Sequence, residues 1–123
     1  MKKFLLLLAI SFSSIQSFAN DLDTPQYLYK ILSAEDWNES QGSRTLELSL
    51  DDEDFIHFSK EDQLDRILDK YWADEAAIVL KIDVAKLSGD LVYETNPGGS
   101  SKYYHLYDGE IPLDAIVDAT AVK

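Results

Sequence analysis

Two histidines, His57 and His105, are the residues of this chain best suited to acid–base chemistry. An imidazole titrates near neutral pH, so it can exchange a proton, contact a phosphate or bind a metal. Each histidine lies in a short run rich in aromatic and β-branched residues, over positions 55–58 and 103–107. Such runs predict strands. Ser59 follows the first run directly.

Side-chain alternation along these two strands defines two faces that carry polar atoms. The faces consist of Phe55, His57 and Ser59, and of Tyr103, His105 and Tyr107. If they meet, the two imidazoles and the hydroxyl groups would line a cleft beside the Gly- and Ser-rich loop 96–101. The alternative is that each histidine is a half-buried strand residue whose ring nitrogens are bonded within the fold.

Other chemistries have weaker support in the sequence. The chain has no cysteine, so a thiol nucleophile and a disulfide framework are excluded. It also lacks a G-x-S-x-G elbow and a phosphate-binding P-loop. A zinc site could combine His57, His105 and an acid such as Glu94, but the histidines lack the close spacing of a metal motif. No metal is therefore expected. The acidic run 51–54 predicts a solvated turn.

The elements that must position these residues alternate between strand and helix patterns. Strands are predicted over 26–32, 55–58, 76–83, 91–94, 103–107 and 113–122. A serine followed three residues later by an acid predicts helices that begin at Ser33 and at Ser59. The second helix should reach Tyr71 and pack on a sheet through the apolar face formed by Leu64, Ile67, Leu68 and Tyr71. Residues 43–50 fit a strand or one helical turn.

Further packing predictions concern the middle of the chain. The nearly continuous apolar run 76–83 indicates a central strand that is covered on both faces. Trp37 is expected in the core of the domain. Residues 84–87 fit no more than a brief helical turn. Together the elements predict an α+β fold.

The N-terminus has the pattern of a secretory signal peptide, since Lys2 and Lys3 precede an apolar run and Ser17 and Ala19 are spaced like a cleavage site. Cleavage would remove residues 1–19 and leave 20–123 as a single globular domain. The protein is then expected to be periplasmic or secreted, without stable membrane association. An uncleaved anchor is the alternative.

Charge restricts the partners of this domain. Without Lys2 and Lys3, nine basic residues stand against 23 acidic ones, a formal balance of −14. Such a surface argues against nucleic acid as a partner. It would also repel anionic ligands at long range, although a local pocket can override the average within a Debye length of about 10 Å. A small-molecule ligand stays compatible with the sequence, which does not indicate an oligomeric state.

Several short motifs, taken in order, resemble the small bacterial family called domain of unknown function 952. They are Tyr29-Lys30-Ile31-Leu32 with Trp37 after it, Phe55-Ile56-His57-Phe58-Ser59, Gln63-Leu64, and His105-Leu106-Tyr107 before Ile111-Pro112-Leu113. The resemblance covers residues 27 to about 122. It implies a fold similar to the ADP-ribosyltransferase superfamily, in which a split β-sheet with two or three helices holds NAD in its cleft.

The resemblance also implies roles for individual residues. His57 would contact the ribose or the nicotinamide-side phosphate of an NAD- or ADP-ribose-type ligand, and Ser59 would assist it. His105 and Tyr107 would close the other side of the pocket, with His105 or Glu94 stabilising charge as the glycosidic bond breaks. Tyr29 and Lys30, in the first motif, are further ligand-binding candidates.

Four positions depart from the family pattern. Asp54 stands where the family usually has glycine, Lys60 replaces threonine, and Tyr104 replaces proline. Asp108 looks like a residue inserted before Gly109. A carboxylate at Asp54 is placed awkwardly for an anionic dinucleotide, which favours an altered ligand or lost catalysis. Two hypotheses therefore stand: an exported ADP-ribosyl- or phosphotransferase-like enzyme, and a non-catalytic periplasmic module that binds a small molecule or a partner.

Overall fold

The computed structural model describes residues 24–122, so the predicted signal peptide lies outside the described residues. The strands are β1 (Tyr27–Ser33), β2 (Ile56–Phe58), β3 (Ala77–Asp83), β4 (Asp90–Thr95), β5 (Lys102–Tyr107) and β6 (Ile116–Val122). The helices are α2 (Ala34–Ser40) and α3 (Leu64–Tyr71), and the 3-10 turns are η1 (Leu50–Asp52), η2 (Glu61–Gln63), η3 (Val84–Lys86) and η4 (Leu113–Ala115). This is a small α+β domain with two helices.

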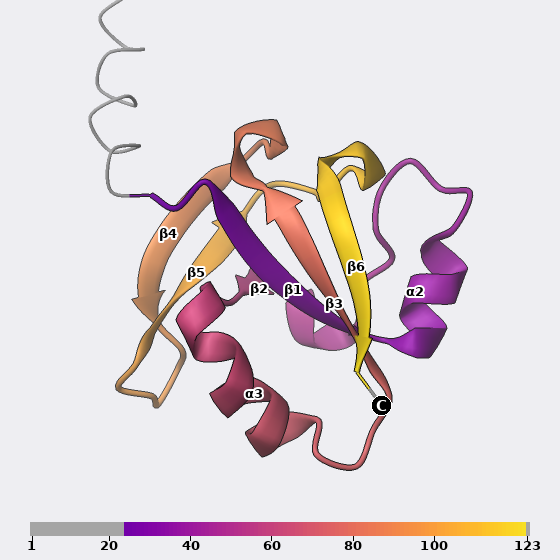
Figure 1. Ribbon diagram of the computed structural model, residues 1–123. Helices are drawn as coiled ribbons and strands as arrows, with labels where there is room; N and C mark the ends of the chain where they lie inside the picture. The colour runs from indigo at the N-terminus through magenta and orange to yellow at the C-terminus, as the bar shows by residue number, and fades with distance from the viewer. Residues whose placement is uncertain (1–23, 123) are drawn as a thin grey trace, which may run out of the picture.

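The strands form two antiparallel sheets of three strands each, in the orders β1-β3-β6 and β2-β5-β4 (Figure 1). The sheets are joined where Tyr29 and Ser59 exchange two backbone hydrogen bonds, both of 2.8 Å. The split sheet predicted from the family resemblance is therefore confirmed. The apolar run 76–83 does supply the middle strand of its sheet, as predicted. The prediction that both faces of this strand are covered was wrong, because only Ala77, Leu80 and Ile82 are buried.

The hydrophobic core lies between the two sheets. Alternation along β1 points Leu28, Lys30 and Leu32 inward, and all three are buried. The second sheet contributes Ile56 and Phe58 from β2, together with Leu106 from β5. A lysine thus occupies one of the inward positions of β1, and its ammonium group needs a polar partner inside the fold.

Helix α2 begins as predicted, because the Ser33 side chain accepts a hydrogen bond from the Asp36 backbone N–H at 3.0 Å. Trp37 is half-buried and packs against the core. Residues 43–50 form neither of the elements predicted for them. Backbone bonds instead connect this segment to the chain after β5, from Leu46 N–H to the Ile111 carbonyl and from Leu113 N–H to the Arg44 carbonyl, both 2.9 Å.

The predicted start of the second helix was wrong. The backbone of Ser59 is bonded to Tyr29 at the junction of the sheets. The N-cap of η2 is instead Lys60, whose N–H donates to Gln63 Oε1 at 2.9 Å. The predicted depth of α3 was also wrong, since none of its residues is buried and Tyr71 is 58% exposed. The reason is that the inner faces of the two sheets cover each other, which leaves α3 outside (Figure 1).

The last strand is shorter than predicted. Residues 113–115 form the turn η4, and β6 begins at Ile116. The other brief turn, η3, lies where the sequence predicted one. Among the described residues, no helix is long and apolar enough to cross a membrane.

Candidate functional site

The two histidines lie directly opposite each other on adjacent strands. β2 pairs with β5 so that His57 faces His105 in the register, and residues paired in this way project from the same side of a sheet. Their ring centroids are 5.4 Å apart, with the planes at 71°. The structure therefore brings together the two histidine-bearing faces, a meeting that the sequence analysis stated only as a condition.

Phe55 covers this pair. Its ring stacks on His105 with the centroids 4.0 Å apart and the planes at 24°. It also contacts His57 at 4.8 Å and Tyr107 at 5.3 Å. An aromatic lid of this kind excludes water from His105, which is 0% exposed, and it strengthens the electrostatic interactions beneath it.

His57 is held by a buried carboxylate. Asp52 Oδ1 lies 3.0 Å from Nδ1 of the His57 ring, 2.9 Å from its backbone nitrogen and 2.8 Å from Lys30 Nζ. The side chains of Lys30 and Asp52 are only 6% and 4% exposed. The partner of the inward ammonium of β1 thus lies at the end of the turn η1, and the same carboxylate orients His57.

The ionisation of Asp52 is well defined. Burial alone would raise the pKa of its carboxyl group, but the hydrogen bond from His57 and the charge of Lys30 together lower it from 3.8 to about 2. Burial lowers the pKa of Lys30, and the attraction of Asp52 opposes this shift. An ionised Asp52 can only accept hydrogen bonds, so Nδ1 of His57 carries a proton. Nε2 is the ring nitrogen that is not bonded to Asp52.

His105 belongs to a second polar network. Its Nδ1 lies 2.7 Å from Glu94 Oε2, and its Nε2 lies 2.8 Å from Asn96 Oδ1. The Tyr107 hydroxyl donates a short hydrogen bond to the same Glu94 oxygen. The amide of Asn96 can serve either state of the ring, accepting from a charged imidazole or, if turned over, donating to a neutral one. Both nitrogens of His105 therefore have partners within the fold.

The Glu94–Tyr107 contact shifts both groups in the expected directions. The hydrogen bond from Tyr107, followed by the one from His105, lowers the pKa of Glu94. The bond to Glu94, with burial and the nearby carboxylates of Glu94 and Asp54 adding to it, raises the pKa of Tyr107. Glu94 thus remains a carboxylate and Tyr107 a neutral phenol at neutral pH.

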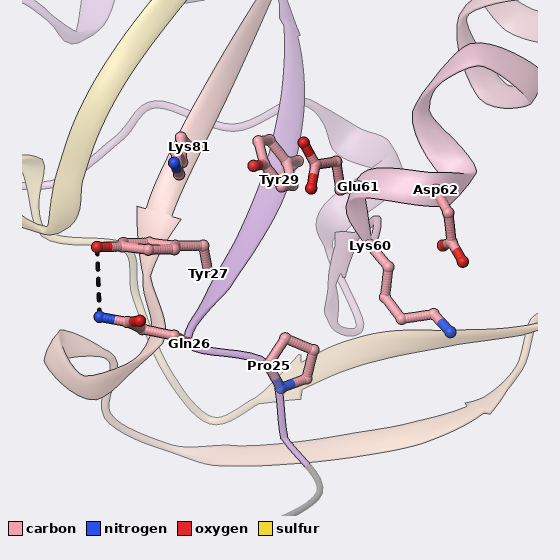
Figure 2. Close-up of a pocket in the computed structure, with 8 residues that line it drawn as sticks. All are labelled: Pro25, Gln26, Tyr27, Tyr29, Lys60, Glu61, Asp62 and Lys81. Carbon is pink, nitrogen blue, oxygen red and sulfur yellow. Dashed lines mark hydrogen bonds between the residues drawn. The ribbon is translucent and has the colours of Figure 1, made fainter.

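Two of the predicted residues lie elsewhere. Tyr29 lines a separate hollow of about 650 Å³ beside β1 and η2, together with Tyr27, Lys60 and Lys81 (Figure 2). Lys81 Nζ lies 4.4 Å from the centre of the Tyr27 ring. Ser59 is buried, and its backbone joins the two sheets. The structure therefore groups His57, His105, Glu94 and Tyr107, links Lys30 to them through Asp52, and separates Tyr29 from them.

Sequence reasoning missed Asp52 and Asn96. The acidic run 51–54 predicts a solvated turn, but the Asp52 carboxylate is buried, so that prediction is wrong for this residue. Four consecutive acids hide the one that turns inward, and the only signal was an inward lysine in β1 that required a counter-charge. Asn96 begins the loop 96–101 that the sequence predicts, and its side chain bonds to His105.

This arrangement favours proton transfer or ligand orientation at His57. The His57 side chain is 38% exposed. One ring nitrogen, Nδ1, is bonded to Asp52 and the other, Nε2, is not, as in carboxylate–histidine pairs that act as general bases. His105 is inaccessible and fits a positioning role. Among residues 24–122, no group of three or more acidic or histidine side chains could hold a metal ion, and the nitrogens of His105 are already bonded.

Comparisons with known proteins give a family and a fold. A family model described as "Protein of unknown function (DUF952)" matches residues 31–119. Among solved structures, the crystal structure of protein CC0527 from Caulobacter crescentus is similar at 26% sequence identity, with a TM-score of 0.67. The similarity covers 79% of this chain and 86% of that one. A double methionine variant of CC0527 matches equally at 25% identity, with the same coverage and TM-score. No curated protein matches.

Proposed function

The chain belongs to the DUF952 family, and we propose that it binds an NAD- or ADP-ribose-type ligand at the cluster formed by Asp52, His57 and Phe55. The observation that carries this proposal is the buried, ionised Asp52 that fixes the His57 ring at 3.0 Å. A partly exposed histidine without a function would not need a buried carboxylate to fix the orientation of its ring. The ADP-ribosyltransferase-like fold that the family resemblance implies supplies the ligand class, and that part rests on fold analogy.

Hydrolysis of NAD is the simplest reaction that this geometry could support. Nε2 of His57 would accept a proton from a water molecule as its oxygen attacks the ribose carbon that carries nicotinamide. The carbon–nitrogen bond then breaks, nicotinamide leaves as a neutral molecule, and the proton passes from His57 to solvent. The positive charge that develops on the ribose would be stabilised by the Glu94 carboxylate.

The residues of the cluster fit one part of such a ligand better than the other. The exposed edge of His57 and the ring of Phe55 suit a ribose and an attached aromatic ring. The ammonium of Lys30 is buried and bonded to Asp52, so it is not available to a pyrophosphate. Asp54 is exposed at the same end of β2 and would repel one. The phosphate charges would have to be met by cations outside the cluster.

Calorimetric titration with NAD and with ADP-ribose, followed by measurement of nicotinamide release, tests the proposal. Binding should weaken at least tenfold in His57→Ala, because the ligand would lose its hydrogen bond to the ring. Lys86→Ala, which alters an exposed lysine on η3, is the matched control. The absence of heat with both ligands, together with no nicotinamide release, would refute the proposal.

A non-catalytic binding module is the second candidate function. It is favoured by His105, Glu94 and Tyr107, which are already satisfied by one another and by Asn96. Under this function the ligand binds and His57→Ala weakens it, but no nicotinamide is released by the unaltered protein. The titration and the release assay, performed on the same samples, therefore separate the two functions.

We also propose that the domain is exported, on the basis of the signal-peptide pattern in residues 1–19. Cell fractionation with mass measurement of the isolated protein is the test. A chain that begins at Asn20 in the periplasm or the medium would support export. A full-length chain in the cytoplasm would contradict it.

A further inference from the structure

Three basic side chains converge on a hollow away from the histidines. Lys60, Arg66 and Lys102 line a space of about 430 Å³. The other lining residues are Asp62, Gln63, Tyr93 and Ser101. None of these residues belongs to the cluster around His57. The balance of charged groups in the hollow is three cations to one carboxylate.

These three cations have no carboxylate within ion-pair distance among the described residues. Without Asp21 and Asp23, 21 of the chain's 23 acidic residues lie in the part that the structure describes. Within that part, Lys30 is the only lysine or arginine in an ion pair. Asp62 is the one carboxylate that lines the hollow, and its charge acts on Lys60. Three convergent cations against this single acid leave a local positive field in a negative protein.

Tyrosine rings position the three cations instead. Lys60 Nζ lies 5.2 Å and Lys102 Nζ lies 5.9 Å from the centre of the Tyr93 ring. The Arg66 guanidinium lies 5.8 Å from the centre of the Tyr103 ring and donates to its hydroxyl at 2.6 Å. Contacts with a ring face orient a cation without neutralising it. The charges of all three groups therefore remain available to an anion.

A buried glutamine fixes the spacing of the two lysines. Gln63 Oε1 accepts from the Lys60 backbone N–H at 2.9 Å, and Gln63 Nε2 donates to the Lys102 carbonyl at 2.8 Å. Gln63 is only 9% exposed, so it ties the start of η2 to the start of β5. The lysines thus project from two backbone segments that are held together, which limits the entropy lost when both bind one ligand.

We propose that this hollow binds the phosphate or diphosphate group of a small organic molecule. Lysine ammonium groups and the arginine fork are the donors that proteins use for phosphate, and the Ser101 hydroxyl lies beside them. Lys60 and Asp62 also line the neighbouring hollow with Tyr27 and Tyr29 (Figure 2). The organic part of the ligand has room there, against the half-buried rings of Tyr27 and Tyr29. This site does not rest on the function proposed for His57.

The test is calorimetric titration with inorganic pyrophosphate at low ionic strength. The unaltered protein should bind one pyrophosphate, and the double variant Lys60→Ala/Lys102→Ala should weaken the association at least tenfold, because two charged hydrogen-bond donors are lost. Lys70→Ala is the matched control: Lys70 makes the same kind of contact, 5.2 Å from the Tyr71 ring centre, and it does not line the hollow.

The outcomes separate cleanly once circular dichroism has shown that each variant is folded. Loss of pyrophosphate binding in the double variant, with binding retained in Lys70→Ala, supports the site. No binding by the unaltered protein, or equal weakening in Lys70→Ala, overturns it. A second comparison uses glycerol 3-phosphate and vesicles containing phosphatidylglycerol. Binding to the vesicles alone would overturn the assignment of a small-molecule ligand. His57→Ala should leave pyrophosphate binding unchanged.

Discussion

Two groups of charged side chains in this domain have opposite electrostatic designs. Around His57 and His105, the carboxylates of Asp52 and Glu94 are each shared by two hydrogen-bond donors from different side chains. Around Lys60, the cations lie against tyrosine rings and have no carboxylate within ion-pair distance in the described residues. The histidine cluster satisfies its charges internally, whereas the lysine hollow leaves its charges open.

This difference predicts different consequences of mutation. A charge that is buried with its partner becomes costly when one member is removed, because the other remains desolvated. An exposed charge that faces solvent loses little when it is removed, and any cost is seen in ligand binding. Variants in the histidine cluster should therefore lower stability, and variants in the lysine hollow should change binding alone.

The largest effect is expected for Asp52→Ala. It leaves the Lys30 ammonium buried without a counter-charge and removes the acceptor of two His57 donors, which should lower the free energy of unfolding by about 3–5 kcal/mol. Urea denaturation followed by circular dichroism measures the loss. The double variant Lys30→Met/Asp52→Leu should recover much of it, because no buried charge remains. A loss under about 1 kcal/mol in Asp52→Ala would contradict the internal pairing.

The next effect contrasts the two histidines. His105→Leu leaves Glu94 and Asn96 without their ring partner in a fully buried position, so it should cost about 3 kcal/mol of stability. His57→Leu replaces a ring that is 38% exposed and should cost roughly 1 kcal/mol. Parallel urea denaturation of both variants measures the difference. Equal losses would indicate that His57 is as structural as His105.

The pH dependence of stability isolates Asp52. Its pKa in the folded state, about 2, lies below the ordinary value of 3.8, so its contribution is complete above about pH 4 and is lost as the pH falls through 2. The shift corresponds to roughly 2 kcal/mol. Unfolding free energies of the unaltered protein and of Asp52→Asn, measured from pH 5 to pH 2, should therefore converge as the pH falls. A constant difference would show that Asp52 has no lowered pKa.

The smallest effect is expected for Lys60→Ala and Lys102→Ala. Both side chains lie at the surface and have no ion pair in residues 24–122, so each substitution should change the free energy of unfolding by less than about 0.5 kcal/mol. Lys70→Ala is again the matched control. A loss of more than about 1 kcal/mol in either variant would mean that the tyrosine contacts hold the fold together, and the contrast between the two regions would fail.

Much of the local structure could be predicted from residue spacing. The alternation in 55–58 and 103–107 predicted two strands that each carry a histidine, and the structure pairs them. The start of α2 was predicted from Ser33 and the acid three residues later, and the structure shows the Asp36 N–H bonded to the Ser33 side chain. The depth of α3 could not be predicted in this way, because an amphipathic pattern states which face is apolar but not how much of the domain is left to cover it.

The candidate site was predicted only in part, for a related reason. His57, His105, Glu94 and Tyr107 carry side chains whose chemistry is recognisable in any context, so the sequence alone determined the groups that could act and the strands that present them. Tertiary structure decided which of them would meet. Asp52 becomes the partner of His57 because β1 sends Lys30 inward, and a buried ammonium requires a carboxylate from elsewhere in the chain. Tyr29 joins Ser59 through its backbone at the junction of the sheets, and its side chain lines the other hollow. Such pairings depend on the packing of distant segments, which no local pattern of residues specifies.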